Sequence, residues 1–526
     1  MGYNFAHVVD TIATQSPDRT AILCVDPEGQ QEVTTYGSLR QATNRFADGL
    51  RQLGIKKADR VLIVLPRCTE SFVIYLALLK LGATAIPGSE MLRAADIKYR
   101  LNHSGAIAVF AHSSLAGEVD KIREECKSVK HCAVVGEQRD GWIHYTSILQ
   151  SGQNEDIQVP TADEDAAFLL YTSGTTGGPK GVLHGYSWPR EHLKIAGTYW
   201  LDPKPNEVIW ATAAPGWGKW IWSPFVTALG NGATSFVYKG RFDPKTYLDL
   251  MEKYQIQLLC ATPTEYRLMA KVDDLASYKL SLRTAVSAGE PLNREAIDRF
   301  KEAFGVTLRD GYGQTESSLA IANLINMELK PGSLGKPFPG MRIAIVDDNG
   351  CEVLPGTVGH IALHKSFPPL FKGYLNDEER TRKAFRGDWF ITGDLGSMDG
   401  DGYFYFEGRA DDIIISSGYT IGPSEVEDAL VKHPKVLDCA VVASPDKERG
   451  HIVKAFVILK DPADRGGDES SLVRELQDHV KRLTAPYKYP RAIEFVDALP
   501  RTTNGKIQRA ELRKREAERA QAISSL

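Results

Sequence analysis

The chain has 526 residues, 43% hydrophobic and 25% charged, which excludes a disulfide-stapled peptide or a disordered tail. Its 63 Lys and Arg residues against 67 Asp and Glu residues leave a net charge of −4 at pH 7, so no overall positive field exists for nucleic acid or an anionic membrane. The seven cysteines are odd in number and have no CxxC spacing, which is typical of a reducing compartment. No apolar run approaches the roughly 20 residues of a membrane span. We therefore expect a cytoplasmic protein of two or three packed units that binds no nucleic acid.

As far as Met398, apolar runs typical of strands alternate with amphipathic helical stretches, which predicts an α/β architecture with largely parallel sheets. The predicted strands are Val61–Leu65, Ala106–Ala111, Ala166–Tyr171, Val208–Ala213 and Gln257–Ala261. Thr69–Leu81 is predicted to be a buried helix that a Thr caps and Gly82 closes. Pro291–Phe304 is predicted to be a surface helix on the rim of a sheet.

Beyond Met398 the sequence becomes turn-rich and charged, and a compact run of short strands and helices follows, ending in the basic segment Gln508–Ala522. We therefore predict a large N-terminal domain of stacked αβ sheets over residues 1–408, a hinge over residues 409–412, and a small α+β C-terminal domain over residues 413–526. The basic segment favours a solvated helix face over a nucleic-acid patch.

The most informative stretch is YTSGTTGGPKG at residues 171–181, directly after a predicted strand. Glycines let backbone N–H groups converge on phosphate oxygens, hydroxyls add donors, and Lys180 supplies a positive charge. A flexible Ser/Gly linker is the alternative, but such linkers rarely lie between a strand and a Pro-Lys-Gly run. A Walker A loop is excluded, because it needs Gly and then Ser or Thr where this chain has Pro179 and Gly181. The stretch is predicted to be a phosphate loop of another kind.

This loop resembles the phosphate loop of the adenylate-forming superfamily, which includes acyl-CoA synthetases, nonribosomal peptide adenylation domains and luciferases. Later motifs agree in order along almost the whole chain. They are SAGEP at 287–291 and DGYGQTE at 310–316, similar to adenine-binding segments; TGD at 392–394, similar to a ribose-binding turn; GRADD at 408–412, similar to an interdomain hinge; and PRTTNGK at 500–506, similar to the loop of the catalytic lysine. The details after residue 417 look most like the medium-chain acyl-CoA synthetases.

The resemblance implies that ATP and Mg²⁺ first convert a carboxylate into an acyl-adenylate, a step in which two anions must be neutralised and aligned. It assigns catalysis to Lys506, Thr315 and Glu316, with Glu316 as the Mg²⁺ ligand and Thr315 at the α-phosphate. It assigns ATP or AMP binding to Thr172, Ser173, Gly174, Thr175, Thr176, Gly177, Lys180, Gly289, Glu290, Pro291, Asp310, Gly311, Tyr312, Gly313, Gln314, Thr315, Asp394, Phe406, Arg409 and Lys506. Taken alone, Asp394 as a turn cap and Tyr312 as a core residue are the alternatives.

The resemblance also implies a second step, in which the small domain rotates about Asp411 and the thiol of CoA attacks the adenylate and expels AMP. The residues that it assigns to CoA binding are Ser417, Gly418, Tyr419 and Arg449, with Gly418 leaving room for the thiol arm. Position 420 departs from the family, because Thr420 stands where Arg is usual and removes a cation that could contact the adenylate or CoA phosphate.

The acyl pocket is predicted to be lined by Trp217, Gly218, Lys219 and Trp220, with Trp217 as the aromatic gate. Indole bulk should shorten the pocket, and one methylene is worth only about 1–3 kcal/mol in a hydrophobic pocket. Short branched, medium straight-chain and aryl acids therefore all stay open. For Trp220 and the nearby Trp222, core packing is an equal alternative.

The motifs together predict an AMP-forming acyl-CoA synthetase of fatty acid metabolism, a monomer or homodimer, that uses ATP, Mg²⁺ and CoA on a short-to-medium-chain, straight or branched acid. An aryl-acid CoA ligase is one alternative. A stand-alone adenylation enzyme that loads a carrier protein is another, disfavoured because no carrier segment follows Lys506. A non-catalytic nucleotide-binding protein is more remote, since the chain keeps Lys180, Glu316, Asp394, Arg409 and Lys506 together.

Overall fold

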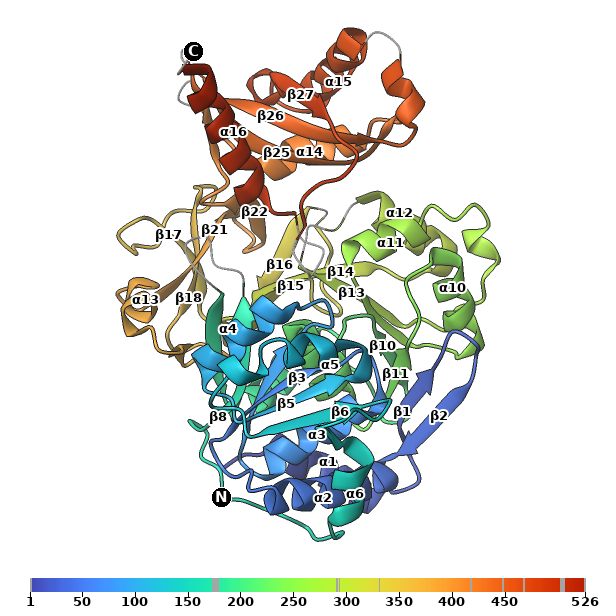
Figure 1. Ribbon diagram of the computed structural model, residues 1–526. Helices are drawn as coiled ribbons and strands as arrows, with labels where there is room; N and C mark the ends of the chain where they lie inside the picture. Colours follow the sequence, from blue (N-terminus) through green and yellow to red (C-terminus); the bar gives the residue numbers. More distant parts are fainter. Residues whose placement is uncertain are drawn as a thin grey trace. The chain divides into compact units, whose positions relative to one another are not determined.

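The computed structural model describes residues 2–172, 179–289, 292, 294–330, 332–416, 419–446, 449–466, 469–501 and 507–524 (Figure 1). The chain divides into two units, one made of Met1–Arg342 with His364–Phe385 and the other of Ile343–Leu363 with Arg386–Leu526. The second unit thus includes strands that precede the hinge predicted at residues 409–412. The division of the chain into domains at that hinge stays a prediction.

One sheet of the first unit has the strand order β19-β9-β8-β4-β3-β5-β6-β7. Its strands are β3 (Arg60–Val64), β4 (Thr84–Gly88), β5 (Ala108–His112), β6 (His131–Val135), β7 (Ile143–His144), β8 (Ala166–Thr172), β9 (Lys180–Gly185) and β19 (Gly373–Tyr374). β3 runs parallel to β4 and β5, and β4 runs parallel to β8, whereas β8 and β9 form an antiparallel pair. The predicted α/β class with largely parallel pairing is confirmed.

Side chains that alternate along β3 explain why helices cover both faces of this sheet. Val61 and Ile63 join an apolar cluster with α1 (Phe5–Gln15), α2 (Tyr36–Gln52) and α3 (Thr69–Lys80). Leu62 and Val64 join another cluster with α4 (Ala94–Ser104) and α5 (Ser113–Asp120). Figure 1 shows α4 and α5 on one side of β3, β5 and β6, and α1 to α3 on the other. Because β3 is buried on both faces, its sequence is an unbroken apolar run, which made it predictable.

The second sheet of this unit has the order β16-β15-β14-β13-β12-β10-β11-β1-β2. Its strands are β1 (Thr20–Val25), β2 (Gln31–Thr35), β10 (Val208–Ala211), β11 (Thr234–Tyr238), β12 (Leu258–Ala261), β13 (Thr284–Ala288), β14 (Leu308–Gln314), β15 (Ser318–Ala322) and β16 (Ser333–Pro337). One face packs on α10 (Pro244–Lys253), α11 (Pro263–Met269) and α12 (Arg294–Phe304). Ile22 and Val237 on the other face join the cluster of α1 and α3, so these helices lie between two stacked sheets.

Helix α3 confirms the buried helix predicted over Thr69–Leu81, and Gly82 follows it in the left-handed conformation at φ +72°. The predicted Thr cap is wrong. Cys68 holds the N-cap position with extended backbone angles (φ −158°, ψ 160°), and Thr69 is already the first helical residue. The Cys68 side chain caps no backbone N–H of the helix, although its sulfur lies 3.3 Å from the Ser71 hydroxyl oxygen, so burial of the helix rather than capping holds this end.

The second unit holds a sheet portion of order β17-β18-β21-β22, a β23-β24 hairpin and a three-stranded sheet β25-β26-β27. The strands are β17 (Ile343–Val346), β18 (Gly359–His364), β21 (Trp389–Met398), β22 (Phe404–Arg409), β23 (Ile414–Ser416), β24 (Tyr419–Ile421), β25 (Val436–Asp446), β26 (Gly450–Leu459) and β27 (Ala492–Phe495). The helices α14 (Pro423–Val431) and α15 (Glu469–Leu483) share an apolar cluster with β25 and β26. The basic C-terminal segment forms the predicted helix, α16 (Arg509–Ser524).

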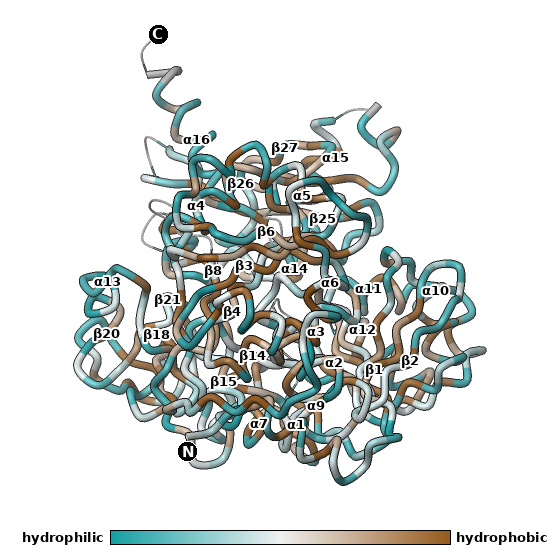
Figure 2. The backbone as a smooth tube through the Cα atoms, turned by 60° about the horizontal axis from the view of Figure 1, so that its bottom comes forward, coloured by the Kyte–Doolittle hydropathy of each residue, from teal (hydrophilic) through white to brown (hydrophobic). Residues whose placement is uncertain are grey.

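Hydrophobic residues gather on the inner strands, such as β3 and β4, whereas the short helix α13 (Glu378–Lys383) is largely hydrophilic (Figure 2). Within the described residues, every helix is too short or too polar to span a lipid bilayer.

Candidate active site

Strands β8 and β9 hold the two ends of the predicted phosphate loop. Thr172, the last residue of β8, lies opposite Lys180, the first residue of β9. Thr172 Oγ1 is buried and has no hydrogen-bond partner among the described residues, and such an orphan hydroxyl costs about 1–3 kcal/mol until a partner arrives. The predicted phosphate ligands Ser173, Gly174, Thr175, Thr176 and Gly177 lie outside the described residues.

Side chains of α4 support the base of this loop. His103 Nδ1 lies 2.9 Å from the hydroxyl oxygen of Tyr171, and the Arg100 guanidinium lies 5.4 Å from the centre of the Tyr171 ring. Tyr99 donates its hydroxyl to the carbonyl of Pro179 at 2.9 Å. Burial raises the pKa of Tyr171, so its hydroxyl stays protonated. The residues on both sides of the loop are therefore anchored to one helix.

The turn between β14 and β15 brings Glu316 close to Lys180, which begins β9. Lys180 Nζ lies 3.4 Å from Glu316 Oε1, and the two side chains are 24% and 9% exposed. Tyr374 on β19 donates its hydroxyl to the same carboxylate oxygen at 2.9 Å. Lys180 Nζ also lies 3.5 Å from that hydroxyl and 5.0 Å from the centre of the Tyr374 ring. Tertiary structure thus joins two residues that the sequence analysis singled out with one that it did not.

Hydrogen bonds fix the direction of the turn that carries Thr315 and Glu316. The Ser317 N–H donates to the Gln314 carbonyl at 3.1 Å, and the Gln314 N–H donates to Ser317 Oγ at 3.2 Å. His184 lies behind the turn, with Nε2 2.6 Å from the Thr315 carbonyl oxygen. Burial lowers the pKa of His184 to about 4, so the ring is neutral at physiological pH and donates to this carbonyl.

The turn ends in a strained residue. Ser318 has a φ of +117°, a conformation that costs a non-glycine residue about 1–3 kcal/mol. Its hydroxyl is buried and lies 2.6 Å from His192 Nδ1, a contact that helps to hold the strain in place. Strained residues of this kind cluster at functional sites, and Ser318 lies two residues after Glu316.

The predicted adenine-binding residues lie at the carboxyl ends of the parallel strands β13 and β14. Gly289 follows β13, is exposed and adopts φ +108°, which favours glycine. Asp310 is 8% exposed and accepts the N–H of Gly311 at 2.9 Å. Burial raises the pKa of Asp310 to about 7, against the effect of its backbone hydrogen bonds and of the Lys219 charge. Glu290 and Pro291 lie outside the described residues.

Packing gives a further reason for the glycines of the β14 motif. A Cβ on Gly313 would lie 2.1 Å from the Ser318 carbonyl oxygen, and a Cβ on Gly311 would lie 2.9 Å from Trp200 and from Leu319. Both positions therefore exclude a side chain whatever they bind. Tyr312, between them, is half-buried.

The predicted acyl-pocket residues separate into two environments. Trp217 and Gly218 are half-buried, and a Cβ on Gly218 would lie 3.0 Å from Leu170 of β8. Lys219 is buried and donates to the carbonyls of Ala261 and Ala288, at 3.2 and 3.3 Å, where β12 and β13 end. An ammonium group thus lies at the same sheet edge as Asp310.

Trp220 is 2% exposed and packs in the core. Its ring stacks on Phe225 at 5.4 Å between centres and lies 5.0 Å from each of Phe72 and Tyr75. These contacts match the core-packing alternative, and the assignment of Trp220 to the acyl pocket stays a prediction.

In the second unit, the predicted ribose-binding pair comes together. Asp394 on β21 lies opposite Arg409 on β22, with 3.2 Å between a carboxylate oxygen and a guanidinium nitrogen. Asp394 is buried and Arg409 is half-buried. The hydroxyl of Thr392 accepts the Asp394 N–H at 3.1 Å and donates to the Ile361 carbonyl at 2.7 Å, which fixes this turn.

The second unit also contains the predicted nucleotide-binding Phe406, the hinge residue Asp411 and the predicted CoA-binding residues. Phe406 on β22 is half-buried, Asp411 is exposed, and the N–H of Arg449 donates to Asp446 at 2.9 Å. Tyr419 begins β24. Ser417, Gly418 and Lys506 lie outside the described residues.

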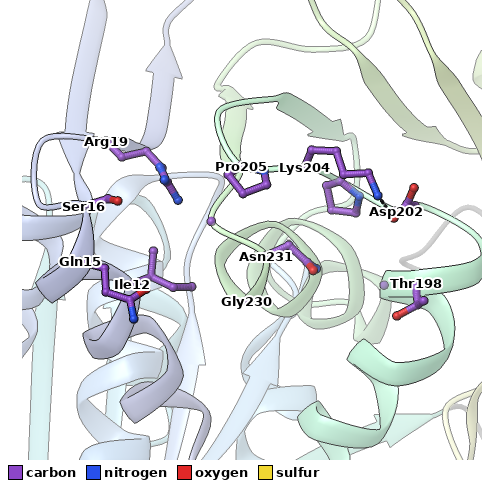
Figure 3. A pocket seen from close by; sticks show the side chains of 13 residues that line it. Ile12, Gln15, Ser16, Arg19, Thr198, Asp202, Lys204, Pro205, Gly230 and Asn231 are labelled. Carbon is purple, nitrogen blue, oxygen red and sulfur yellow. Dashed lines mark hydrogen bonds and ion pairs between the residues drawn. The ribbon is translucent and has the colours of Figure 1, made fainter.

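A hollow of about 520 Å³ lies between the carboxyl ends of α1 and α7 (Trp188–Tyr199) in the first unit (Figure 3). Arg19 and Lys204 bring positive charge to it, and Lys204 is paired with Asp202 at 2.5 Å. Its lining contains none of the predicted site residues.

Comparison with known proteins agrees with this geometry. A family model described as AMP-binding enzyme matches residues 9–375, and one described as AMP-binding enzyme C-terminal domain matches residues 425–506. The chain belongs to the AMP-binding enzyme family. The first match ends just after Tyr374, and residues 409–412 lie between the two matches.

Relatives in this family are ligases. A Bacillus subtilis (strain 168) protein named uncharacterized acyl-CoA ligase YtcI is 51% identical over 98% of this chain and 96% of its own length. The Mus musculus mitochondrial acyl-coenzyme A synthetase ACSM3 is 39% identical over 94% of this chain and 86% of its own length. A crystal structure of the anthranilate CoA ligase AuaEII in complex with anthranoyl-AMP has a TM-score of 0.90 at 29% identity, covering 99% of this chain and 98% of that one. The predicted family resemblance, fold class and enzyme class, an AMP-forming acid-thiol ligase, are confirmed.

Tyr374 and His184 are two residues near the site that the sequence analysis missed. Both contact the Thr315–Glu316 turn from strands of the other sheet, across long stretches of sequence. No local motif marks either residue as part of the site, because what makes them relevant is the stacking of two sheets.

Proposed function

We propose that the protein is an AMP-forming acyl-CoA synthetase of fatty acid metabolism that joins a short-to-medium-chain carboxylic acid, straight or branched, to CoA. The observation that carries the proposal is the part-buried Lys180–Glu316 pair at the end of the predicted phosphate loop, beside Thr172, whose buried hydroxyl has no hydrogen-bond partner in the part of the chain that the structure describes. The pair offers a cation for phosphate oxygens and a carboxylate for a metal ion within one site.

In the proposed first step, Lys180 turns from Glu316 toward the phosphates of ATP, and Thr172 donates its hydroxyl to them. A 3.4 Å ion pair is long for a charge-assisted hydrogen bond, so little has to be broken for Lys180 to move. Thr315 presents donors to the α-phosphate from a turn that is already rigid, which avoids reorganisation during the reaction.

The chemistry of Glu316 fits Mg²⁺, which prefers carboxylate oxygens. Glu316 is 7% exposed, its backbone carbonyl accepts the Phe371 N–H at 2.7 Å, and its carboxylate faces Lys180. Glu316 would hold the ion, and Mg²⁺ when bound would offset charge on the phosphates.

For the second step we propose that the C-terminal domain, residues 413–526, turns about Asp411 within a hinge at 409–412. This turn would move Lys506 out of the active site and bring in the CoA tunnel formed by Ser417, Gly418, Tyr419 and Arg449. Asp394 and Arg409 would hold the ribose, and Phe406 and Tyr312 would flank the nucleotide. Residues 1–408 would form the ATP- and acyl-binding domain. The remaining proposed nucleotide ligands are Ser173, Gly174, Thr175, Thr176, Gly177, Gly289, Glu290, Pro291, Asp310, Gly311, Gly313 and Gln314.

An aryl acid is the second candidate substrate. Half-buried Trp217 and Trp222 beside Gly218 suit a flat ring as well as a short chain, and the structural relative with TM-score 0.90 is an anthranilate CoA ligase. The buried ammonium of Lys219 at the end of β12 adds a polar group that a substituted ring could use.

We propose a cytoplasmic location for a monomer or homodimer. All seven cysteines are described, and none of them is in a disulfide, while six are buried. Unpaired thiols of this number are typical of a reducing compartment.

The test is pyrophosphate release with ATP and Mg²⁺ against acetate, isobutyrate, 2-methylbutyrate, hexanoate, octanoate, benzoate and anthranilate, each with and without CoA. The expected result is an optimum among the short or medium aliphatic acids with CoA-dependent AMP release. An optimum on benzoate or anthranilate would favour the aryl candidate. Exchange without CoA turnover would indicate a carrier-protein acceptor, and silence across the panel would overturn the proposal.

The two-step scheme has its own test. Lys506→Ala is expected to abolish acyl-adenylate formation and to spare thiol attack on supplied acyl-adenylate, whereas Gly418→Leu is expected to do the reverse. Equal loss of both steps in a folded Lys506→Ala protein would remove Lys506 from its proposed role.

A further inference from the structure

Tyr374 contacts both members of the Lys180–Glu316 pair. Its side chain is 8% exposed, its hydroxyl donates to Glu316 Oε1 at 2.9 Å, and Lys180 Nζ lies 3.5 Å from the hydroxyl oxygen. The hydroxyl bond to the carboxylate is the shorter of these contacts and also shorter than the 3.4 Å between Lys180 and Glu316. Tyr374 therefore holds Glu316 more closely than the lysine does.

The backbone around Tyr374 ties the phosphate loop to the Glu316 turn. Tyr374 is paired with Val182 of β9, and the Leu375 N–H donates to the carbonyl of Gly181 at 2.8 Å, one residue after Lys180. On the other side, the Phe371 N–H donates to the Glu316 carbonyl at 2.7 Å. The short strand β19 therefore fixes the Tyr374 ring relative to both Lys180 and Glu316.

A Thr side chain holds the same short strand in place. The Tyr374 N–H donates to Thr381 Oγ1 at 2.9 Å, and Gly373 adopts φ +137°, where a Cβ would lie 3.3 Å from the Thr381 side chain. The aromatic ring of Phe371 also lies 4.9 Å from that of Tyr374. The hydroxyl is thus delivered by a rigid support rather than by a mobile side chain.

The charges explain why such a support is useful. While Lys180 stays beside Glu316, the buried carboxylate has a counter-ion. When Lys180 turns to the phosphates of ATP, as the proposed function requires, the carboxylate loses that partner and would become an uncompensated buried charge. A donor that stays behind keeps the carboxylate in place until a metal ion replaces the lysine.

We propose that Tyr374 is a positioning residue that keeps Glu316 oriented for the divalent cation after Lys180 has moved to the phosphates. This inference rests on the proposed function, in which Glu316 holds Mg²⁺. It does not require Tyr374 to touch ATP or the cation, and so it predicts an effect on cation affinity that passes through Glu316.

The test is Tyr374→Phe, which removes the hydroxyl and keeps the ring. The concentration of Mn²⁺ that half-saturates the full-length protein with ATP is measured by electron paramagnetic resonance, and the Mg²⁺ dependence of acid-dependent pyrophosphate exchange is measured alongside. Both half-saturating concentrations are expected to rise about tenfold, because a hydrogen bond to a charged group is lost. The KM for the carboxylic acid is expected to stay the same.

Tyr186→Phe is the matched control. Tyr186 directly follows β9, is buried, and donates its hydroxyl to the carbonyls of Ala83 at 2.9 Å and Leu79 at 3.3 Å. This variant also loses a buried tyrosine hydroxyl bond, but away from Glu316, and its cation affinity is expected to match the parent. An equal shift in Tyr186→Phe, or no shift in Tyr374→Phe, would overturn the inference.

A double-mutant cycle with Glu316→Gln keeps the result interpretable if Tyr374→Phe is less stable. Adding Tyr374→Phe to Glu316→Gln is expected to leave the Mn²⁺ affinity unchanged, since Tyr374 acts through Glu316. Additive losses would contradict this. Absence of acid-dependent exchange in the parent protein would instead count against the proposed function, which separates the two failures.

Discussion

Two buried or part-buried lysines of the first unit, Lys80 and Lys180, make a revealing comparison. Lys80 on α3 is 0% exposed and donates to Asp10 of α1, to Asn44 of α2 at 2.7 Å and to Asp156 at 3.4 Å. Lys180 is 24% exposed and has its described contacts at 3.4 and 3.5 Å. The Lys80 ammonium is surrounded by three acceptors, whereas the Lys180 ammonium makes only longer contacts among the described residues.

The comparison distinguishes a lysine that stabilises the fold from one that we propose acts in the reaction. An ammonium group has three donors, and those of Lys80 are matched by partners from two other helices and a following segment, so the cluster ties α1, α2 and α3 together. Burial raises the pKa of Asp10 and the Lys80 charge opposes this shift, so the carboxylate depends on its lysine. Lys180 instead lies 3.4 Å from Glu316, and in the proposed function it exchanges that partner for phosphate.

The largest effect is expected for Lys80→Met, which should lower the free energy of unfolding by about 3–5 kcal/mol because buried Asp10 loses its close lysine partner and is left with Arg40, 3.8 Å away. Urea unfolding measures it, and the specific activity of the remaining folded protein should match the parent. Adding Asp10→Asn should recover part of the loss. A change below about 1 kcal/mol in Lys80→Met would break the comparison.

The next effect is expected for Lys180→Ala, with acyl-adenylate formation reduced about 10²–10³-fold, equivalent to about 3–4 kcal/mol of transition-state stabilisation. Pyrophosphate exchange measures the rate, and urea unfolding should show a smaller loss of stability than Lys80→Met. If Lys180→Ala unfolds the protein as much as Lys80→Met does, the loose pair is structural after all.

A pH effect sharpens the comparison on the side of the site. Because burial lowers the folded-state pKa of His184 to about 4, below the unfolded value of 6.5, its contribution to stability is complete above pH 6.5 and is lost as pH falls toward 4. At pH 5 the loss is about 2 kcal/mol. Unfolding free energies at pH 7.5 and pH 5 should differ by about that much less in His184→Gln than in the parent, and an identical difference in both proteins would reject the assignment.

The smallest effect is expected at an exposed ion pair, which gives the baseline. Lys383 and Glu379 on α13 are 2.5 Å apart, and their side chains are 66% and 68% exposed. Because water screens such a pair, Lys383→Ala should leave the urea midpoint within experimental error. A clear shift would show that ion-pair distance, rather than burial, decides the effect.

The strands, including the two that flank the predicted phosphate loop, were predictable because their signals are local. The buried run Ala166–Tyr171 corresponds to β8 (Ala166–Thr172), and Lys180 begins β9 on the far side of the loop. Val208–Ala213 and Gln257–Ala261 correspond to the shorter strands β10 (Val208–Ala211) and β12 (Leu258–Ala261). Strand ends were less accurate, since hydrogen-bond partners rather than the apolar run decide where pairing stops.

Residues that depend on distant partners could not be predicted in the same way. Lys80 was only the polar end of an apolar run, and its three partners lie 36 to 76 residues away. From the sequence, Trp220 could have lined a pocket or packed in the core. Its ring contacts with Phe72 and Phe225 arise from helix packing, which the sequence does not show. The predicted Thr cap of α3 was wrong for a local reason. The helix begins one residue earlier than a Thr69 cap requires, so Cys68 holds the cap position and Thr69 is already helical.

By itself, the sequence determined the α/β class and the membership of a ligase family, and it predicted a phosphate loop and a series of nucleotide motifs, because these depend on periodicity and on residues close together in the chain. Only the tertiary structure decided that Glu316 meets Lys180, that Tyr374 and His184 support the same turn, and that Lys80 is a structural charge. The physical reason is that two stacked sheets bring together side chains more than 100 residues apart, such as Lys180 and Glu316, whose separation is 136 residues. The degree of burial then distinguishes Lys80, which protein partners surround completely, from Lys180, which stays partly exposed.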